Sequence, residues 1–225
     1  MSEEPREKST AARAVLFDLD GTLLDTLQDL SDAVNAALSH LGHPVHPTDA
    51  YRTMVGSGIE HLLEAALPAE RRNGAEVAVA VDLASRAYAD GWRNATHPYE
   101  GVPELLAELD RRRIPTAVIS NKPHPFTLLA VRHFFPNHPF GAVLGDRPGV
   151  PRKPDPAMAL EAAAIMGVPP GDCLLLGDSG SDMRAARSAG MTAAAALWGF
   201  RGRAELESAG AEVLLTKPLG LLTLL

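Results

Sequence analysis

The sequence predicts an α/β protein built on a doubly wound parallel sheet, with an all-helical subdomain inserted into it. Three observations support this fold class. Short apolar segments bounded by Gly, Pro or Asp alternate with helical patterns through most of the chain. One long stretch near the N-terminus contains helical patterns only. Several apolar segments end in acidic or hydroxyl side chains, at the edge where open α/β sheets bind their ligands.

Six segments are predicted to be strands of the sheet. They are short and apolar without polar alternation, as strands covered on both faces must be. Helical patterns lie between several of them, so strands and helices alternate along the chain. The predicted strands are 14–17, 116–120, 141–144, 173–177, 192–197 and 212–215, and the predicted helices of this part lie near 103–113, 155–166 and 182–189.

Residues 24–95 interrupt this alternation. They contain no strand-like run, and their apolar residues recur at helical spacing in three separate stretches. We therefore expect a helical cap over 24–95, inserted into an α/β core made of 13–23 and 96–225. The charged residues 1–12 are predicted to form a disordered tail.

Composition excludes several functional classes. The formal net charge of −7 leaves no basic surface for nucleic acid. Apolar segments are too short to span a bilayer, and the single cysteine, Cys173, suits a reducing compartment. We expect a cytoplasmic monomer or homodimer that binds neither nucleic acid nor membrane.

Acidic side chains follow two of the predicted strands. Asp18 and Asp20 come after the first strand, and Asp178 comes after the segment 173–177. Three carboxylates at one point would repel one another unless a hard cation lay between them, and Mg²⁺ suits such oxygen ligands. Lys153 and the Ser120 hydroxyl would then donate to a dianionic ligand. The ligand that fits is a phosphate, which the backbone N–H groups of a loop containing Gly21 and Thr22 could approach closely.

Four motifs occur in an order that resembles the haloacid dehalogenase-like superfamily of phosphotransferases. They are FDLDGTLLDT, VISNKP, RKPDP and LLLGDSGSDMRAARSAG, and they span the predicted core. The resemblance implies that Asp18 attacks phosphorus and forms an aspartyl-phosphate. It implies that Asp20 protonates the leaving oxygen and later deprotonates water, that Lys153 neutralises phosphoryl charge, and that Asp178 completes the Mg²⁺ site.

Asp182 has two interpretations. It could support the metal site through water or Lys153, or it could cap the helix in which it lies. The acid at position 20 argues against dehalogenation, because dehalogenases of this superfamily lack an acid there. The phosphonate-cleaving branch uses a cap lysine, and residues 24–95 contain none.

The cap stretch YRTMVGSGIEHLL bears on the substrate. Gly56, Ser57 and Gly58 precede a helix, so their N–H groups could bind an anion; an ordinary helix cap is the alternative. Similar turns reach the substrate in phosphoglycolate phosphatase-like members of the superfamily, often after an arginine, here Arg52. The SNKP string, with Asn121, also resembles these members, and we expect Asn121 to contact the substrate.

The expected function is Mg²⁺-dependent hydrolysis of a small acidic phosphomonoester such as 2-phosphoglycolate. Nucleotides, sugar phosphates and pyrophosphate stay open as substrates. A phosphosugar mutase and a non-catalytic sensor of a phosphorylated metabolite are the alternatives. The sequence does not decide whether His124, Trp198 or Phe200 reaches the pocket.

Overall fold

The computed structural model describes residues 11–225. Most of the predicted tail, residues 1–10, lies outside this range. At the last residue of the predicted tail 1–12, the Ala12 N–H donates to the Leu224 carbonyl over 2.9 Å. The chain is therefore already tied to the core one residue before the predicted start of the core.

A six-stranded parallel sheet forms the core, in the order β5-β4-β1-β6-β7-β8. β1 is central, and its Phe17 lies opposite Val118 on one side and Leu176 on the other. All six predicted strands are present, and the α/β fold class is confirmed. The strands are β1 Ala14–Phe17, β4 Thr116–Pro123, β5 Ala142–Asp146, β6 Cys173–Gly177, β7 Thr192–Ala196 and β8 Val213–Leu215.

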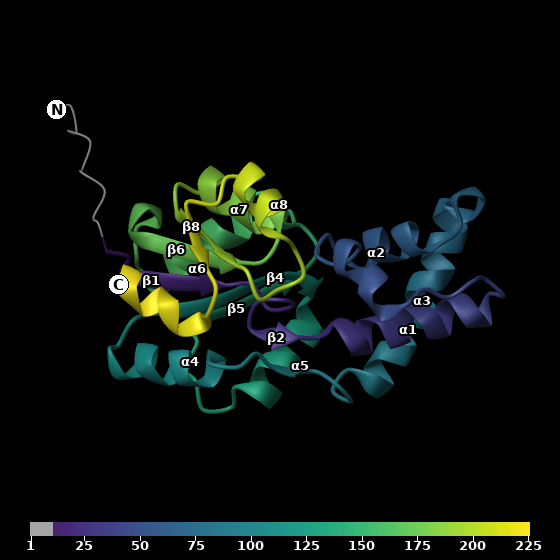
Figure 1. Cartoon of the computed structure of the whole chain (residues 1–225), viewed down its shortest axis with the longest axis horizontal. Helices are drawn as coiled ribbons and strands as arrows, with labels where there is room; N and C mark the ends of the chain where they lie inside the picture. The colour runs from purple at the N-terminus through teal and green to yellow at the C-terminus, as the bar shows by residue number, and fades with distance from the viewer. Residues whose placement is uncertain (1–10) are drawn as a thin grey trace.

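Helices cover both faces of the sheet, as Figure 1 shows. Because side chains alternate along a strand, Val15 and Phe17 of β1 pack in one hydrophobic cluster while Leu16 packs in the other. The first face is covered by α4 Val102–Arg111, α5 His124–Phe134 and the C-terminal 3₁₀ helix η4 Pro218–Leu224. The second is covered by α6 Ala157–Met166, α7 Gly180–Ser188 and α8 Arg203–Ser208, and the short η3 Pro170–Asp172 precedes β6.

Two of these helices, α5 and α8, were not among the predicted ones. His124, whose contribution to the pocket the sequence left open, is the first residue of α5. Pro125 stands in the first turn, where its missing N–H costs nothing and its fixed φ suits a helix. A proline near a strand end therefore marked the start of a helix here.

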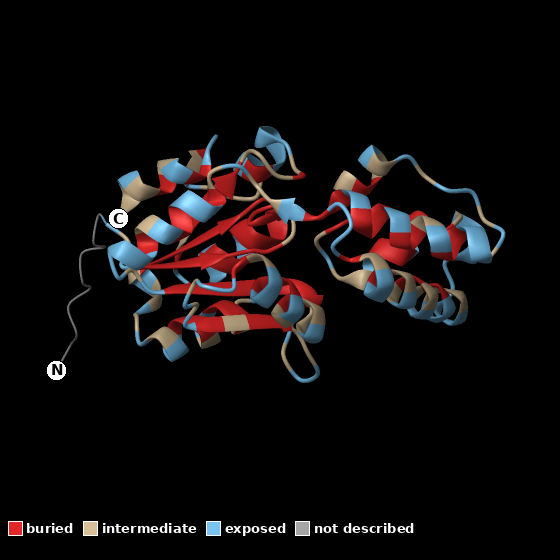
Figure 2. Cartoon of the chain, turned by 90° about the horizontal axis from the view of Figure 1, so that it is seen from below, coloured by how far each residue is buried: buried red, intermediate tan, exposed pale blue. Residues whose placement is uncertain are grey.

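A helical lobe lies beside the carboxyl edge of the sheet, at the right of Figure 1. Its helices α1 and α2 both pack against α3, and their inner faces are buried in the view of Figure 2. These helices account for the three apolar stretches of 24–95. They are α1 Leu27–His40, α2 Ile59–Ala66 and α3 Gly74–Gly91, joined by the 3₁₀ turns η1 Thr48–Thr53 and η2 Ala69–Arg71.

The two chain crossings between core and lobe form a small antiparallel ribbon that the sequence did not predict. It pairs β2 Leu24–Asp25 with β3 His97–Pro98. The buried Asp29 carboxylate ties these crossings together, since it accepts the Ala95 and Thr96 N–H groups, each over 2.9 Å, and the Thr96 hydroxyl over 2.6 Å.

Aromatic side chains join α3 of the lobe to α5 of the core. The Tyr88 and Phe126 rings meet edge to face with centroids 5.2 Å apart. Trp92 meets His133 and Phe134 in the same way, at 5.3 and 5.9 Å. Within residues 11–225, no helix is long and apolar enough to cross a lipid bilayer.

Replacing Asp29 tests how much the crossing depends on its carboxylate. Asp29→Ala removes three hydrogen bonds and leaves the buried Thr96 N–H and hydroxyl without their acceptor, so we expect the free energy of unfolding to fall by about 2–4 kcal/mol. Urea denaturation measures this loss. Asp32, exposed on the same helix, is the control, and Asp32→Ala should change stability by less than about 0.5 kcal/mol. Equal effects of the two substitutions would contradict the role given to Asp29.

Candidate active site

Four chain segments far apart in the sequence meet at the carboxyl edge of the sheet, next to the helical lobe. They are the loop after β1, the end of β4, the loop before α6 and the loop after β6. Parallel strands place their carboxyl ends at one edge, and ligands bind there in open α/β sheets. The buried polar side chains of the core concentrate at the same place: Asp18, Ser120, Asn121, Lys122, Lys153, Asp178 and Asp182.

Lys153 is a buried cation that bridges two carboxylates. Its Nζ lies 2.7 Å from Asp18 Oδ1 and 2.7 Å from Asp182 Oδ1, and it also donates to the Ile119 carbonyl over 3.0 Å. Burial alone would lower the pKa of Lys153, but Asp18 and Asp182 together raise it above its usual value. The ammonium group is therefore fixed in place and charged.

The Asp178 carboxylate is positioned by donors from two loops. Its Oδ2 accepts the Phe200 N–H over 2.7 Å, and its Oδ1 accepts the Thr22 hydroxyl over 3.2 Å. Gly21, at φ +84°, has room for this carboxylate only because it lacks a side chain, since a Cβ there would lie 2.2 Å from Asp178 Oδ2. Gly199 is required for the same reason, with 2.3 Å between a Cβ and Asp178 Cβ.

Three carboxylates, those of Asp18, Asp178 and Asp182, carry more negative charge than Lys153 compensates. Oxygens of Asp18, Asp178 and Asp182 lie within 4.8 Å of one another, and all three residues are buried. Burial, followed by repulsion from Asp182, raises the pKa of Asp18 to about 7 although Lys153 opposes the shift. Burial and the two neighbouring carboxylates raise the pKa of Asp178 well above its usual value. A divalent cation with oxygen ligands fits this donor set.

Within this group Asp182 is already engaged on both oxygens. Besides Lys153 at Oδ1, its Oδ2 accepts the Ser179 N–H over 3.1 Å and the Ser179 hydroxyl over 2.6 Å. Ser179 is the N-cap of α7 and Asp182 is its third helical residue, a capping box. Both interpretations of Asp182 thus hold in part, because it caps the helix and it supports Lys153. Asp18 and Asp178 are left to hold a metal.

Asp20 lies apart from the other carboxylates, contrary to the expectation that three acids after two strands converge on one point. Both of its oxygens lie 3.0 Å from Lys122 Nζ, a residue to which the sequence assigned no role. Lys122 in turn lies 4.6 Å from the centre of the Tyr88 ring, on α3 of the lobe. Only the folded chain shows this pairing, since 102 residues separate Asp20 from Lys122.

A cavity lies between this group and the lobe. Its polar end is formed by Asp18, Asp20, Ser120, Asn121 and Lys122. Its other end is formed by the lobe and α5, with side chains that include Leu30, Val34, Val55, Leu62, Tyr88 and Phe126. A ligand could therefore reach the carboxylates from a space that the lobe encloses.

Comparison with known proteins agrees with this geometry. The family model of the haloacid dehalogenase-like hydrolases matches residues 15–196. The chain belongs to this family. The matched residues include the four motifs and the whole helical lobe.

Individual relatives resemble this hydrolase over most of its length. Phosphoglycolate phosphatase 1 of Pseudomonas aeruginosa is 34% identical over 201 residues, which are 88% of this chain and 74% of that protein. A phosphoglycolate phosphatase of Psychrobacter arcticus is 32% identical, over 83% of this chain and 84% of its own. The crystal structure of a candidate phosphoglycolate phosphatase from Lactobacillus delbrueckii subsp. bulgaricus has a TM-score of 0.88 and 31% identity, and covers 94% of this chain and 97% of that one.

In the loop after β1 of this hydrolase, the backbone N–H groups donate to carbonyls close by in the sequence. The Gly21 N–H donates to the Leu24 carbonyl over 2.8 Å, and the Thr22 N–H donates to the Leu19 carbonyl over 3.4 Å. The expectation that these two N–H groups approach a phosphate is therefore not what the structure shows. Gly21 and Thr22 serve the site by making room for Asp178 and by donating to it.

Asn121 is expected to contact substrate, but its amide is occupied by the protein. Its Nδ2 donates to the Gly56 and Lys153 carbonyls, each over 2.9 Å, and its Oδ1 accepts the Lys153 N–H over 2.9 Å. Asn121 thereby connects Lys153 to the helical lobe. The Ser120 hydroxyl accepts the Lys122 N–H over 3.2 Å and lines the cavity.

The cap residues expected at the substrate divide into two groups. Gly56 and Gly58 line the cavity, whereas Ser57 is exposed and does not. Arg52 is directed elsewhere, since it pairs with Asp49 over 3.2 Å and lines a different, shallow depression near the ribbon. The similarity of the stretch YRTMVGSGIEHLL to the cap turn of relatives therefore did not predict where the Arg52 side chain points.

The three residues left open by the sequence do not line the cavity. The His124 ring accepts the Gly145 N–H over 3.0 Å. The Trp198 indole donates to the Thr22 carbonyl over 3.0 Å, and the Phe200 N–H holds Asp178. Trp198 and Phe200 thus hold Thr22 and Asp178 in place without lining the cavity.

Metal binding should stabilise this protein in a pH-dependent way. A buried carboxyl with a raised pKa contributes stability below its unfolded pKa, and that stability is lost as the pH rises through the folded pKa, here about 7 for Asp18. Mg²⁺ offsets the repulsion between the ionised groups. At about 100 times its Kd it should stabilise the fold by about 2.7 kcal/mol and raise Tm by about 5–10 °C at pH 8, with a smaller shift at pH 5.5.

Differential scanning calorimetry with and without Mg²⁺ measures this shift. Asp178→Asn retains the shape of the side chain but removes a charge, so it should abolish most of the Mg²⁺ effect and raise Tm in metal-free buffer. A shift of equal size at both pH values, or in the variant, would contradict a site built on these carboxylates.

Proposed function

We propose that this hydrolase cleaves phosphomonoesters with Mg²⁺ as cofactor and Asp18 as the nucleophile. The observation that carries the proposal is the buried Lys153, which bridges Asp182 and Asp18, a residue at the polar end of the cavity. Phosphoryl transfer needs a fixed nucleophile and a fixed positive charge on the transferred group. Lys153 supplies the positive charge and orients the nucleophile.

Asp18 is suited to attack phosphorus. Its Oδ1 accepts the Leu19 N–H over 2.7 Å and contacts Lys153. Within residues 11–225 its Oδ2 takes no hydrogen bond, so a lone pair on that oxygen can attack. The attack forms a bond to phosphorus and expels the alcohol oxygen, and the resulting acyl phosphate is then cleaved by water.

Asp20 is suited to move the proton in both steps. It lines the cavity, two residues beyond the nucleophile, and Lys122 holds both of its oxygens. It would donate a proton to the leaving alcohol oxygen and then take one from the attacking water. The Tyr88 ring beside Lys122 comes from the lobe, so a closed lobe supports the position of Asp20.

Asp18 and Asp178 would hold Mg²⁺ at this site. When bound, Mg²⁺ would neutralise charge on the phosphoryl oxygens during transfer. Thr22 and Phe200 orient Asp178 for this task through their hydrogen bonds to it.

The single buried cysteine, Cys173, supports a reducing compartment such as the cytoplasm.

The names of the relatives support 2-phosphoglycolate as a candidate substrate. Arg52, the cap cation that the sequence offered for its carboxylate, lies outside the cavity. Small phosphorylated metabolites are the substrate class that the site supports, with 2-phosphoglycolate as the reference compound. A mutase would need the same Asp20, and a sensor would need neither Asp18 nor Asp20.

Asp18→Asn tests the nucleophile. We expect phosphate release from p-nitrophenyl phosphate with Mg²⁺ to fall by at least about 10³-fold, because the amide cannot form the acyl phosphate. Asp20→Asn should lower release by about 10²–10⁴-fold. The exposed Asp49 of the lobe gives the control, and Asp49→Asn should retain wild-type activity. Substantial phosphate release by Asp18→Asn would contradict the proposal. If the wild-type protein cleaves none of the esters, a sensor is favoured.

A further inference from the structure

The cavity has two chemically different ends. The end next to Asp18 carries charged and polar groups, where the phosphoryl group would lie. The other end is formed mainly by aliphatic and aromatic side chains of α1, α2, α3, α5 and the turn before α2, with Ser85 as a polar exception. Leu30, Val34, Val55 and Leu62 are among these side chains, and all four are buried.

Positive charge is scarce around this apolar end. Among the described residues that line the cavity, Lys122 is the only cation. It is paired with Asp20, whose two carboxylate oxygens each lie 3.0 Å from Lys122 Nζ. The lining contains neither arginine nor histidine. A second anionic group on a substrate could pair with Lys122 only by displacing Asp20, the proposed proton donor.

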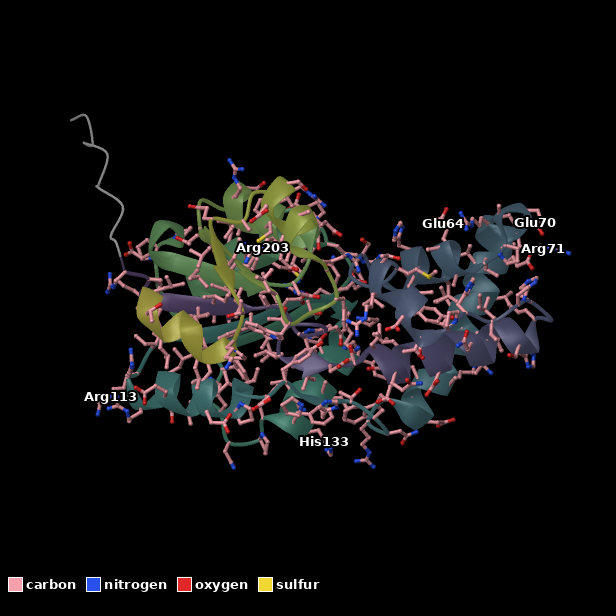
Figure 3. The ribbon with its side chains drawn as sticks, in the orientation of Figure 1. Glu64, Glu70, Arg71, Arg113, His133 and Arg203 are labelled. Atoms are coloured by element: carbon pink, nitrogen blue, oxygen red, sulfur yellow. The ribbon has the colours of Figure 1, made fainter. Side chains whose placement is uncertain are left out.

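Arginines near the cavity are directed to other partners. Arg152 pairs with Asp146 over 2.6 Å and with Glu60 over 2.8 Å. Arg201 donates through Nη2 to the Thr53 and Val55 carbonyls of the lobe and pairs through Nε with Glu205. Its Nη1 is buried without a hydrogen-bond partner in the part of the chain that the structure describes, but Arg201 is not among the residues that line the cavity. Figure 3 labels three charged side chains of the lobe, Glu64, Glu70 and Arg71, and all three lie on its outer surface.

This distribution determines which organic group the cavity can hold. A carboxylate or a second phosphate at the apolar end would lose its hydration without gaining a counter-charge, which is costly. An alkyl group there would leave water for an apolar surface, which is favourable in proportion to the area buried. The cavity should therefore bind a neutral organic group better than a charged one at the position a few bonds beyond the phosphorus.

We propose that this hydrolase prefers phosphomonoesters of neutral, apolar alcohols over those whose organic group carries a charge. The proposal rests on the proposed phosphatase function and defines the substrate class of the same site. The preferred substrate would then differ from the 2-phosphoglycolate in the names of the relatives. The described lining of the cavity contains no cation that a substrate carboxylate could pair with unless it displaced Asp20 from Lys122.

The deciding experiment compares 2-phosphoglycolate with isobutyl phosphate. The two esters have the same number of heavy atoms and the same branching, and they differ in charge. The carboxylate makes glycolate the better leaving group, so intrinsic reactivity works against the proposal. We expect kcat/KM for isobutyl phosphate to be at least about tenfold higher, since a pocket must release a charged group's water to bind it.

A series of straight-chain esters measures the apolar contribution. From ethyl to propyl to butyl phosphate the leaving-group chemistry stays constant, and each methylene should raise kcat/KM by about threefold to fourfold while it fits the cavity. A flat series would place the organic group outside the apolar end and overturn the proposal.

Ser85 provides a matched pair of variants. It lines the cavity from α3 and is partly exposed, so a longer side chain has room there. Ser85→Lys adds a cation to the cavity wall, and Ser85→Met adds similar length without charge. Relative to Ser85→Met, Ser85→Lys should shift the ratio of kcat/KM toward 2-phosphoglycolate by about tenfold. An unchanged ratio would count against the proposal, after thermal melting has shown that both variants fold.

Hydrolysis of p-nitrophenyl phosphate separates failure of the substrate class from failure of the function. If this activated ester is cleaved but isobutyl phosphate is not, or if 2-phosphoglycolate is cleaved as well as isobutyl phosphate, the preference for apolar alcohols is wrong and the phosphatase stands. If none of the esters is cleaved with Mg²⁺ present, the proposed function itself fails.

Discussion

Lys153 lies between two buried carboxylates, and most of the site depends on its charge. Without that ammonium group, Asp18 and Asp182 would face each other at the edge of the sheet with only a helix N-terminus to oppose their repulsion. The lysine fixes the Asp18 carboxylate, and the α7 cap fixes Asp182 through Ser179. Burying three acids against one lysine leaves a negative excess, which is a cost to folding that a bound divalent cation would offset.

The same lysine is connected to the helical lobe through its backbone. Asn121 bonds to both the N–H and the carbonyl of Lys153, and its remaining N–H reaches the Gly56 carbonyl. Arg152, the residue before the lysine, reaches Glu60 on α2. A short stretch of the core thus fixes the Lys153 backbone and contacts the lobe through Gly56 and Glu60. The contacts that hold the lysine therefore also hold the lobe that lines the cavity.

Much of the fold could be predicted from the sequence, and the reason is periodicity. Strands buried on both faces must be short and apolar, and the lobe helices must repeat apolar residues at helical spacing. Apart from α5, whose start is marked by Pro125, the elements that were missed are too short to have a strong periodic signal. The pair Leu24–Asp25 and His97–Pro98 is too short to show a pattern, and α8 has six residues. The candidate acids and Lys153 were found because each stands at the end of a predicted strand or in a loop motif.

The sequence by itself determined the layered α/β core, the helical insertion and the set of residues at the carboxyl edge. Only the tertiary structure decided how those residues are paired: Asp20 with Lys122 instead of with the other acids, Asn121 with the backbone instead of a substrate, and Arg52 away from the cavity. The physical reason is that the residue type and its element are local properties, whereas the partner of a charged side chain depends on which distant segment folding brings within hydrogen-bond distance of it.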